Sequence, residues 1–351
     1  MEETSGRRYV PNPEDHYVHV PLWVWAITIA FVIGLLVFDF FTHVRTPHAP
    51  TLRESSLWST FYVGLGLAFG VMLWFVWDHQ HGLEYFAGFL TEKSLSVDNL
   101  FVFLIIMTSF RVPIEYQQKV LLIGIAIALV MRGIFIALGA TIIENFSWAF
   151  YIFGAFLVYT AWKLANSSHD EDEEYHENAF IRFVRRVLPT TDTYVGDKMV
   201  VRIDGRRMIT PMAIVMLAIG STDLLFAFDS IPAIFGLTQE PYIVFTANAF
   251  ALLGLRQLYF LLGGLLDRLI YLSYGLAFIL GFIGVKLVIH ALHKNEVPFI
   301  NGGEHITVIP EIPTYVSLGV IIITIAITAW LSLRATNRAE AANGGPPAAA
   351  H

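Results

Sequence analysis

The chain has no cysteine, which excludes disulfides, thiolate metal sites, iron–sulfur clusters and a cysteine nucleophile. It is also poor in charge, because only 15% of its 351 residues are Asp, Glu, Lys or Arg, whereas a soluble domain has about 25%. It contains no Gly-rich phosphate loop, no nucleophile elbow and no HExxH motif. We therefore expect no enzyme, no ATP-driven pump, no bound cofactor and no nucleic-acid partner.

Long apolar runs take the place of the missing charges. Hydrophobic residues make up 56% of the chain, and several runs of about 20 residues are long enough to cross a lipid bilayer. The pattern predicts an all-α membrane protein in one transmembrane domain, residues 1–335, with 336–351 as a disordered tail. Nine spans are predicted, at 22–41, 55–77, 84–110, 118–141, 147–165, 210–236, 242–266, 269–291 and 313–334.

The positive charges indicate how these spans are oriented. With the N-terminus outside, fifteen Lys and Arg residues lie in or beside inner segments, three lie outside and four lie within spans. Inner loops of membrane proteins carry this excess of positive charge. We expect a multi-pass membrane protein with its N-terminus outside and its C-terminus in the cytoplasm.

The longest loop, 166–209, then faces the cytoplasm. It has an acidic run at 169–177 and a basic amphipathic stretch at 180–188, which suits a helix on the anionic inner leaflet. A turn at Asp204-Gly205 predicts a small hairpin. The loop has no core of its own, so we expect it to serve at most as a binding segment for a cytoplasmic partner.

Two acidic motifs interrupt the apolar runs at related positions. The first is Glu92-Lys93-Ser94-Leu95-Ser96-Val97-Asp98-Asn99, and the second runs from Asp223 to Asp229-Ser230. Each motif has an acid, a second acid six residues later and then a small polar residue. Charged side chains within a span cost several kcal/mol unless they face a cavity or a partner.

The echo extends to basic residues. Arg132 and Arg256 follow the two acidic motifs and are 124 residues apart, and Lys163 and Lys286 are 123 residues apart. The corresponding acids of the two motifs are 131 residues apart. The predicted repeats are 84–165 and 210–291, each with three spans. Because three is odd, the second copy would enter the membrane the other way up, as in many secondary transporters.

The acidic motifs suggest a cation site between the repeats. Carboxylate, carboxamide and hydroxyl oxygens suit Mn²⁺, Mg²⁺ or Ca²⁺. On a continuous helix the second acid lies about 120° from the first, so convergence of all four requires local unwinding, which Pro232 favours in the second motif. The candidate ligands are Asp98, Asp229, Glu92, Asp223, Asn99 and Ser230.

The alternative is that these groups bind nothing. The acids would then pair with the in-span bases, and Asn99 and Ser230 would be interhelical hydrogen-bonding groups. The candidate charge partners are Lys93, Arg132, Arg256 and Lys286. Asp78, His79 and His81, before the third span, could form an exit mouth or be ordinary surface residues.

These motifs carry a family resemblance. The chain resembles the TerC family of integral membrane proteins, and within it the Alx-like branch, on both acidic motifs, Arg256 and Gly284-Val285-Lys286. The resemblance covers residues 20–335. It implies a bacterial inner-membrane protein and, for the Alx-like branch, manganese export. Other members are associated with tellurite resistance or with assembly of exported or membrane proteins.

Together these readings predict a secondary exporter of a divalent cation, with Mn²⁺ as the first choice, working by alternating access at the carboxylates. The alternative is a membrane scaffold or assembly factor that works through 166–209 and is linked to tellurite resistance or to insertion or metallation of exported proteins. The coupling ion is left open between protons and Na⁺.

Overall fold

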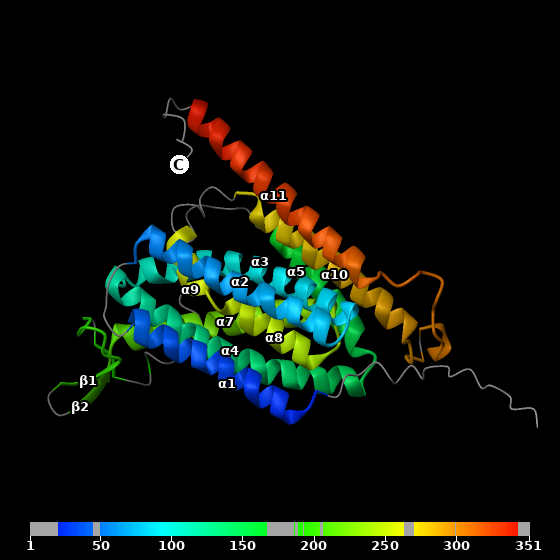
Figure 1. The fold of residues 1–351 in the computed structure, drawn as a ribbon, viewed down its shortest axis with the longest axis horizontal. Coiled ribbons are helices and arrows are strands. Elements are labelled where there is room, and N and C mark those ends of the chain that lie inside the picture. Colours follow the sequence, from blue (N-terminus) through cyan, green and yellow to red (C-terminus); the bar gives the residue numbers. More distant parts are fainter. Residues whose placement is uncertain are drawn as a thin grey trace, which may run out of the picture.

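The computed structural model is a bundle of long helices with a small β-hairpin at one end (Figure 1). It describes residues 20–44, 50–166, 186, 189–191, 193–203, 206–262, 270–298 and 300–342. In these ranges seven helices are long and apolar enough to cross a membrane: Leu22–Thr42, Leu52–Val76, Ile114–Ile143, Pro211–Phe235, Pro241–Leu261, Leu272–His293 and Thr314–Arg338. The predicted class, an all-helical membrane protein, is confirmed.

Within the described residues, each predicted span overlaps one or two helices. The helices are α1 (Leu22–Asp39, continued by a π-helix, Phe40–Val44), α2 (Leu52–Val76), α3 (His79–Ser109), α4 (Ile114–Asn145), α5 (Ala149–Asn166), α7 (Pro211–Phe235), α8 (Pro241–Leu252), α9 (Leu255–Leu262), α10 (Leu272–His293) and α11 (Thr314–Ala342). Residues 336–342, which we expected to be disordered, are thus helical, and 343–351 lie outside the described residues.

Helices α3 and α5 coincide with predicted spans but are less apolar than the other seven. Glu84, Glu92, Lys93 and Asp98 interrupt α3, and α5 is only 18 residues long and ends in Lys163 and Asn166. Helix α3 is nevertheless central, because it packs against α2, α7, α8 and α11. Its charges therefore lie among other helices, where each requires a polar partner.

Three helix pairs build the core. Helix α3 packs against α8, α4 against α7, and α5 against α10. The last pair is the closest, because a Cβ atom added to Gly154 would lie 2.9 Å from the Gly284 carbonyl oxygen, and one added to Gly284 would lie 2.9 Å from the Gly154 oxygen. Only glycine permits backbones to approach so closely. The three pairs give the bundle a continuous apolar interior.

The two ends of the bundle differ. At the hairpin end, strand β1 (Val200–Ile203) pairs antiparallel with β2 (Arg206–Ile209). Tyr194 Oη donates to the Phe110 carbonyl at 2.8 Å, and Lys119 Nζ donates to Asp197 at 2.6 Å, which attaches this segment to the helices. The strands are as predicted, whereas the turn at 204–205, the acidic run and all but Arg186 of the stretch 180–188 lie outside the described residues.

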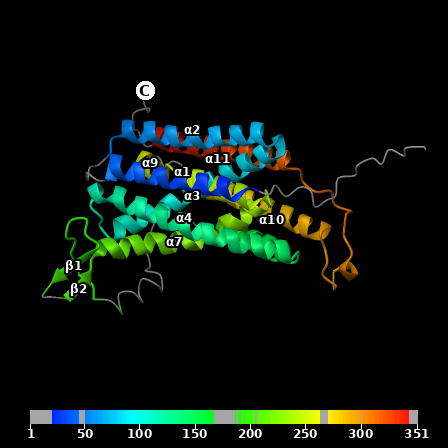
Figure 2. The same ribbon diagram turned by 60° about the horizontal axis from the view of Figure 1, so that its bottom comes forward.

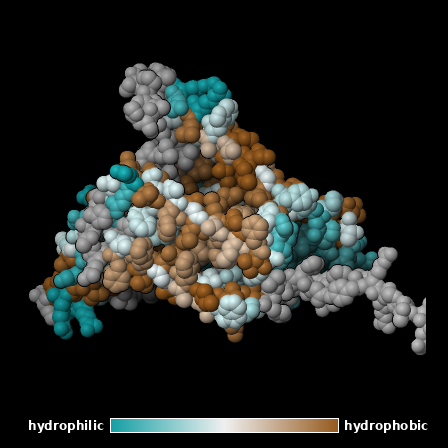
Figure 3. Space-filling model, in the orientation of Figure 1, coloured by the Kyte–Doolittle hydropathy of each residue, from teal (hydrophilic) through white to brown (hydrophobic). Residues whose placement is uncertain are grey.

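At the pocket end, the starts of α3, α8 and α11 meet the ends of α7 and α10 around a cavity. Helix α11 contacts α3 and α10. Its C-terminal half extends away from the bundle in Figure 1, and it overlaps α2 only in projection in the turned view of Figure 2. In Figure 3 the hydrophobic surface occupies the middle of the molecule, and hydrophilic residues gather at the hairpin end and the pocket end. This distribution is the one a membrane-spanning bundle requires.

The structure corrects one prediction about helix breaks. Helices α3 and α7 are continuous, and α7 remains helical through Pro232, so the unwinding that we expected in them is absent. The break lies instead within 242–266, at Leu253 and Gly254, between the end of α8 at Leu252 and the start of α9 at Leu255. Gly254 has a φ of 80°, in the left-handed region that favours glycine.

A side chain at this break should destabilise the protein. A Cβ atom at Gly254 would meet Tyr62 Cβ at 2.6 Å, and the left-handed backbone adds a strain of roughly 1–2 kcal/mol for a residue with a Cβ. We expect Gly254→Ala to lower the thermal unfolding midpoint of the purified protein in detergent by several degrees. The matched control is Gly64→Ala on α2, where nothing lies within 4 Å of the added atom. Equal midpoints for the two variants would contradict this account.

Candidate functional site

A buried arginine joins three helices at the centre of the bundle. Arg132 of α4 binds Asp223 of α7 through two hydrogen bonds, from Nε to Oδ2 at 3.2 Å and from Nη2 to Oδ1 at 3.3 Å. Its Nη1 also forms an ion pair with Glu92 Oε1 of α3. The exposed fractions of the Arg132, Glu92 and Asp223 side chains are 1%, 0% and 2%. Arginine suits this role because its planar guanidinium can serve two carboxylates at once.

Neutral groups complete the cluster. Arg132 Nη1 donates to Ser230 Oγ at 3.2 Å and to Asn248 Oδ1 at 2.9 Å, and Ser96 Oγ donates to Glu92 Oε1 at 3.1 Å. The second carboxylate oxygen of Glu92, Oε2, is buried and has no hydrogen-bond partner among the residues that the structure describes. Because an unpartnered buried carboxylate oxygen is costly, this oxygen is the group in the cluster most in need of a proton or a cation.

The direct contacts of the cluster do not balance its charge. Two carboxylates share one guanidinium, and Lys93, although next to Glu92 in sequence, turns to the backbone of α8, where its Nζ donates to the Ala251 carbonyl at 2.9 Å. The predicted pairing is therefore correct for Arg132, which binds the first acid of both motifs. Arg132 and the two carboxylates that it binds together carry one formal negative charge.

The second acid of each motif lies elsewhere. Asp98 Oδ1 accepts a hydrogen bond from Ser273 Oγ of α10 at 3.3 Å, and Asp229 Oδ1 accepts one from Thr160 Oγ1 of α5 at 3.2 Å. The prediction that four carboxylates converge is wrong for this conformation, because α3 and α7 remain helical and keep their acids on different faces. In the part of the chain described, no three His, Asp or Glu side chains gather closely enough to hold a metal ion.

The remaining candidate residues have separate environments. Ser230 belongs to the Arg132 cluster, whereas Asn99 is buried on α3 and makes no contact with Arg132. Arg256 forms its ion pair with Asp39 of α1, from Nη2 to Oδ1 at 2.6 Å, rather than with one of the four acids, which corrects its predicted pairing.

Asp39 and Asn248 take part in these contacts but were not among the residues predicted from the sequence. Asp39 is a single acid at the end of the first span, and Asn248 is a single carboxamide inside an apolar run. Asp39 is the one charged residue of the first predicted span, and that charge was the available signal. Asn248 shares its predicted span with Thr246, Arg256 and Gln257, so nothing in the sequence singled it out.

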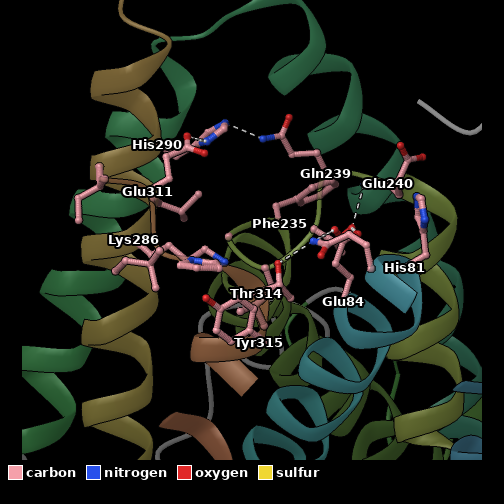
Figure 4. Close-up of a pocket in the computed structure, with 18 of the residues that line it drawn as sticks. His81, Glu84, Phe235, Gln239, Glu240, Lys286, His290, Glu311, Thr314 and Tyr315 are labelled. Carbon is pink, nitrogen blue, oxygen red and sulfur yellow. Dashed lines mark hydrogen bonds and ion pairs between the residues drawn. The ribbon is translucent and has the colours of Figure 1, made fainter. Parts of the chain in front are cut away.

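A cavity of about 820 Å³ opens at the pocket end (Figure 4). Lys286 of α10 lines one wall, and Glu84 of α3 lies on the opposite side. Glu84 is fixed by Gln80 Nε2 at 2.8 Å and by Thr238 Oγ1 at 2.7 Å. Lys286 makes no hydrogen bond or ion pair with the described residues, so this predicted charge partner instead contributes a positive charge to the cavity.

A histidine bridges the upper part of the same cavity. His290 of α10 contacts Gln239 at 2.6 Å through Nε2 and Glu311 at 2.8 Å through Nδ1. Asp78 and His81 also line the cavity, together with Glu240. The structure therefore places two of the three residues considered for an exit mouth at a real opening, one of mixed charge.

The comparisons agree with this architecture. The model of the integral membrane protein TerC family matches residues 77–340. The chain belongs to the TerC family. An uncharacterized membrane protein of Mycobacterium tuberculosis strain H37Rv is 52% identical over 314 residues, covering 88% of this chain and 79% of that protein. An uncharacterized membrane protein of Myxococcus xanthus is 42% identical over 266 residues, covering 76% and 83%.

A third relative has a functional name. The Escherichia coli K12 protein named "Putative membrane-bound redox modulator Alx" is 38% identical over 302 residues, covering 83% of this chain and 88% of that protein. No solved structure gives a significant match. The comparisons thus establish family and membrane class, and the names of these relatives specify no transported substrate.

Removing the central guanidinium should expose the charge imbalance. We expect Arg132→Met to cost about 3–5 kcal/mol, because the variant leaves buried carboxylates unpaired. Adding Glu92→Gln and Asp223→Asn to the same chain should recover much of that stability, which the thermal unfolding midpoint in detergent can measure. If the losses from the separate variants simply add, the residues do not act as one cluster.

Proposed function

We propose that the protein is a secondary exporter of a divalent cation, with Mn²⁺ as the first candidate. One observation carries the proposal: two buried carboxylates share a single guanidinium, and Glu92 Oε2 has no hydrogen-bond partner in the described part of the chain. Charged groups inside spans are rare and often mark substrate or ion pathways. A cluster one positive charge short is suited to taking up and releasing cations.

The donor atoms favour a hard cation. The Arg132 cluster offers carboxylate oxygens from Glu92 and Asp223, a hydroxyl from Ser230 and a carboxamide oxygen from Asn248. Oxygen sets of this kind suit Mn²⁺, Mg²⁺ and Ca²⁺ rather than copper. In the proposed cycle, Arg132 occupies the site when no metal is bound and withdraws as the ion enters.

The helix packing supports alternating access. If 84–165 and 210–291 are inverted repeats, α3, α4 and α5 of the first repeat correspond to α7, α8 and α10 of the second. The α3–α8 contact then corresponds to the α7–α4 contact, and the α5–α10 contact corresponds to itself. All three contacts are present. Transporters of this kind bind their substrate near the middle of the membrane, between the repeats, where Arg132 joins α3 and α4 of one half to α7 of the other.

The remaining acids mark a route in this proposal. Asp98 and Asp229 lie against the α5–α10 pair, away from Arg132, so they would hold the ion before or after the central site instead of binding it together with Glu92. With the N-terminus outside, the pocket end is periplasmic. The cavity beside Lys286 would then be the exit, where a positive charge shortens the residence of a departing cation.

The name of the Escherichia coli relative refers to redox modulation. Because this chain has no cysteine, a comparable effect in its host would not depend on its own thiol chemistry. A change in the concentration of a redox-active metal such as manganese would be one indirect route.

Transport into inverted membrane vesicles tests the proposal. We expect vesicles with the wild-type protein to accumulate Mn²⁺. Repeating the measurement with and without a pH gradient tests whether protons are the coupling ion, and Mg²⁺ and Ca²⁺ are measured in parallel. Asp223→Asn should reduce accumulation about tenfold or more, since losing one carboxylate ligand readily costs the roughly 1.4 kcal/mol that this factor represents. The matched control is Asp197→Asn, which changes the ion pair with Lys119 near the hairpin. Equal Mn²⁺ accumulation by Asp223→Asn, the control and the wild type would refute the central site.

A second experiment tests the route. We expect Asp98→Asn and Asp229→Asn to raise cellular Mn²⁺ to the level of a strain lacking the gene, because each removes a negative charge along the pathway. Cellular metal content at matched expression is the measurement. Normal efflux by both variants would remove these two acids from the pathway.

A further inference from the structure

The end of α8 creates an unusual site within the bundle. The helix ends at Leu252, and α9 begins only at Leu255. The exposed fractions of Ala251, Leu252 and Leu253 are 0%, 0% and 3%, so water is excluded from their backbone. The last carbonyls of a helix have no intrahelical donor, and away from water they need another partner.

Lys93 supplies that partner. Its Nζ donates to the Ala251 carbonyl oxygen at 2.9 Å and to the Leu253 carbonyl oxygen at 3.4 Å. These are its only hydrogen bonds to the described residues. The neighbouring carboxylate of Glu92 does not bind Lys93, since its Oε1 contacts Arg132 and Ser96 instead. An ammonium group that binds two backbone carbonyls at a helix C-terminus satisfies both the orphaned acceptors and the negative end of the helix dipole.

We propose that the C-terminal end of α8 is an alkali-cation site and that the Lys93 ammonium is its built-in occupant. Broken helices in transporters present such carbonyls to Na⁺ at membrane depth. In this protein a tethered cation takes that position, so the break is held without an external ion. Lys93 is then a positioning residue, which fixes α8 against α3 beside Glu92.

Replacing the tethered cation should make the protein depend on a free one. We expect Lys93→Ala to lower the thermal unfolding midpoint in choline chloride and to recover most of the loss in NaCl or KCl at equal ionic strength. Lys93→Met should be destabilised in all three salts, because its uncharged side chain still fills the space. The wild type and the exposed control Lys294→Ala should unfold at the same temperature in each salt.

This outcome is independent of transport, so it can fail while the exporter proposal stands, and the reverse. Absence of rescue of Lys93→Ala by Na⁺ or K⁺, whether as an unchanged midpoint or as no folded protein in any salt, would overturn the inference. A Lys93→Met variant as stable as the wild type in choline chloride would do so as well.

Discussion

A guanidinium shared by two carboxylates holds the centre of this membrane protein. Arg132 reaches Glu92 on α3 and Asp223 on α7 from its own position on α4, and all three side chains are buried. In such surroundings an ion pair with a missing member is far more costly than a complete one. The relative positions of three helices therefore depend on one side chain, and sliding any of them along the bundle would expose a buried charge.

Arg132 and Arg256 occupy corresponding positions in the two predicted repeats but bind different partners, and the break at Gly254 accounts for the difference. Arg132 lies on a continuous helix and points into the centre, whereas Arg256 follows the break at Gly254 and binds Asp39 of α1. If the halves descend from one repeat, the break diverted the second arginine to a helix outside both repeats. The same break ended α8 early and left carbonyls for Lys93 to bind.

The sequence located the helical spans and most of the buried charges, Asp39 excepted, but not the directions in which those charges point. Apolar runs of 20 residues locate spans because bilayer thickness imposes that length. The direction of a carboxylate depends on how its helix is rotated against its neighbours, which periodicity cannot give for apolar segments buried on most sides. Hence Glu92 and Asp223 lie together at Arg132, as expected, whereas Asp98 and Asp229 lie elsewhere and Asn248 was overlooked.

Both sites at the centre are occupied by cations that belong to the chain itself. Arg132 fills the space between two carboxylates, and Lys93 fills the end of α8. A transported ion would therefore enter by competition with a tethered positive charge and not by filling a vacancy, so its binding energy is reduced by the cost of moving a guanidinium. That cost lowers the affinity of the site for the transported ion. An exporter must release its ion on the far side of the membrane, and a site that binds too strongly does not turn over.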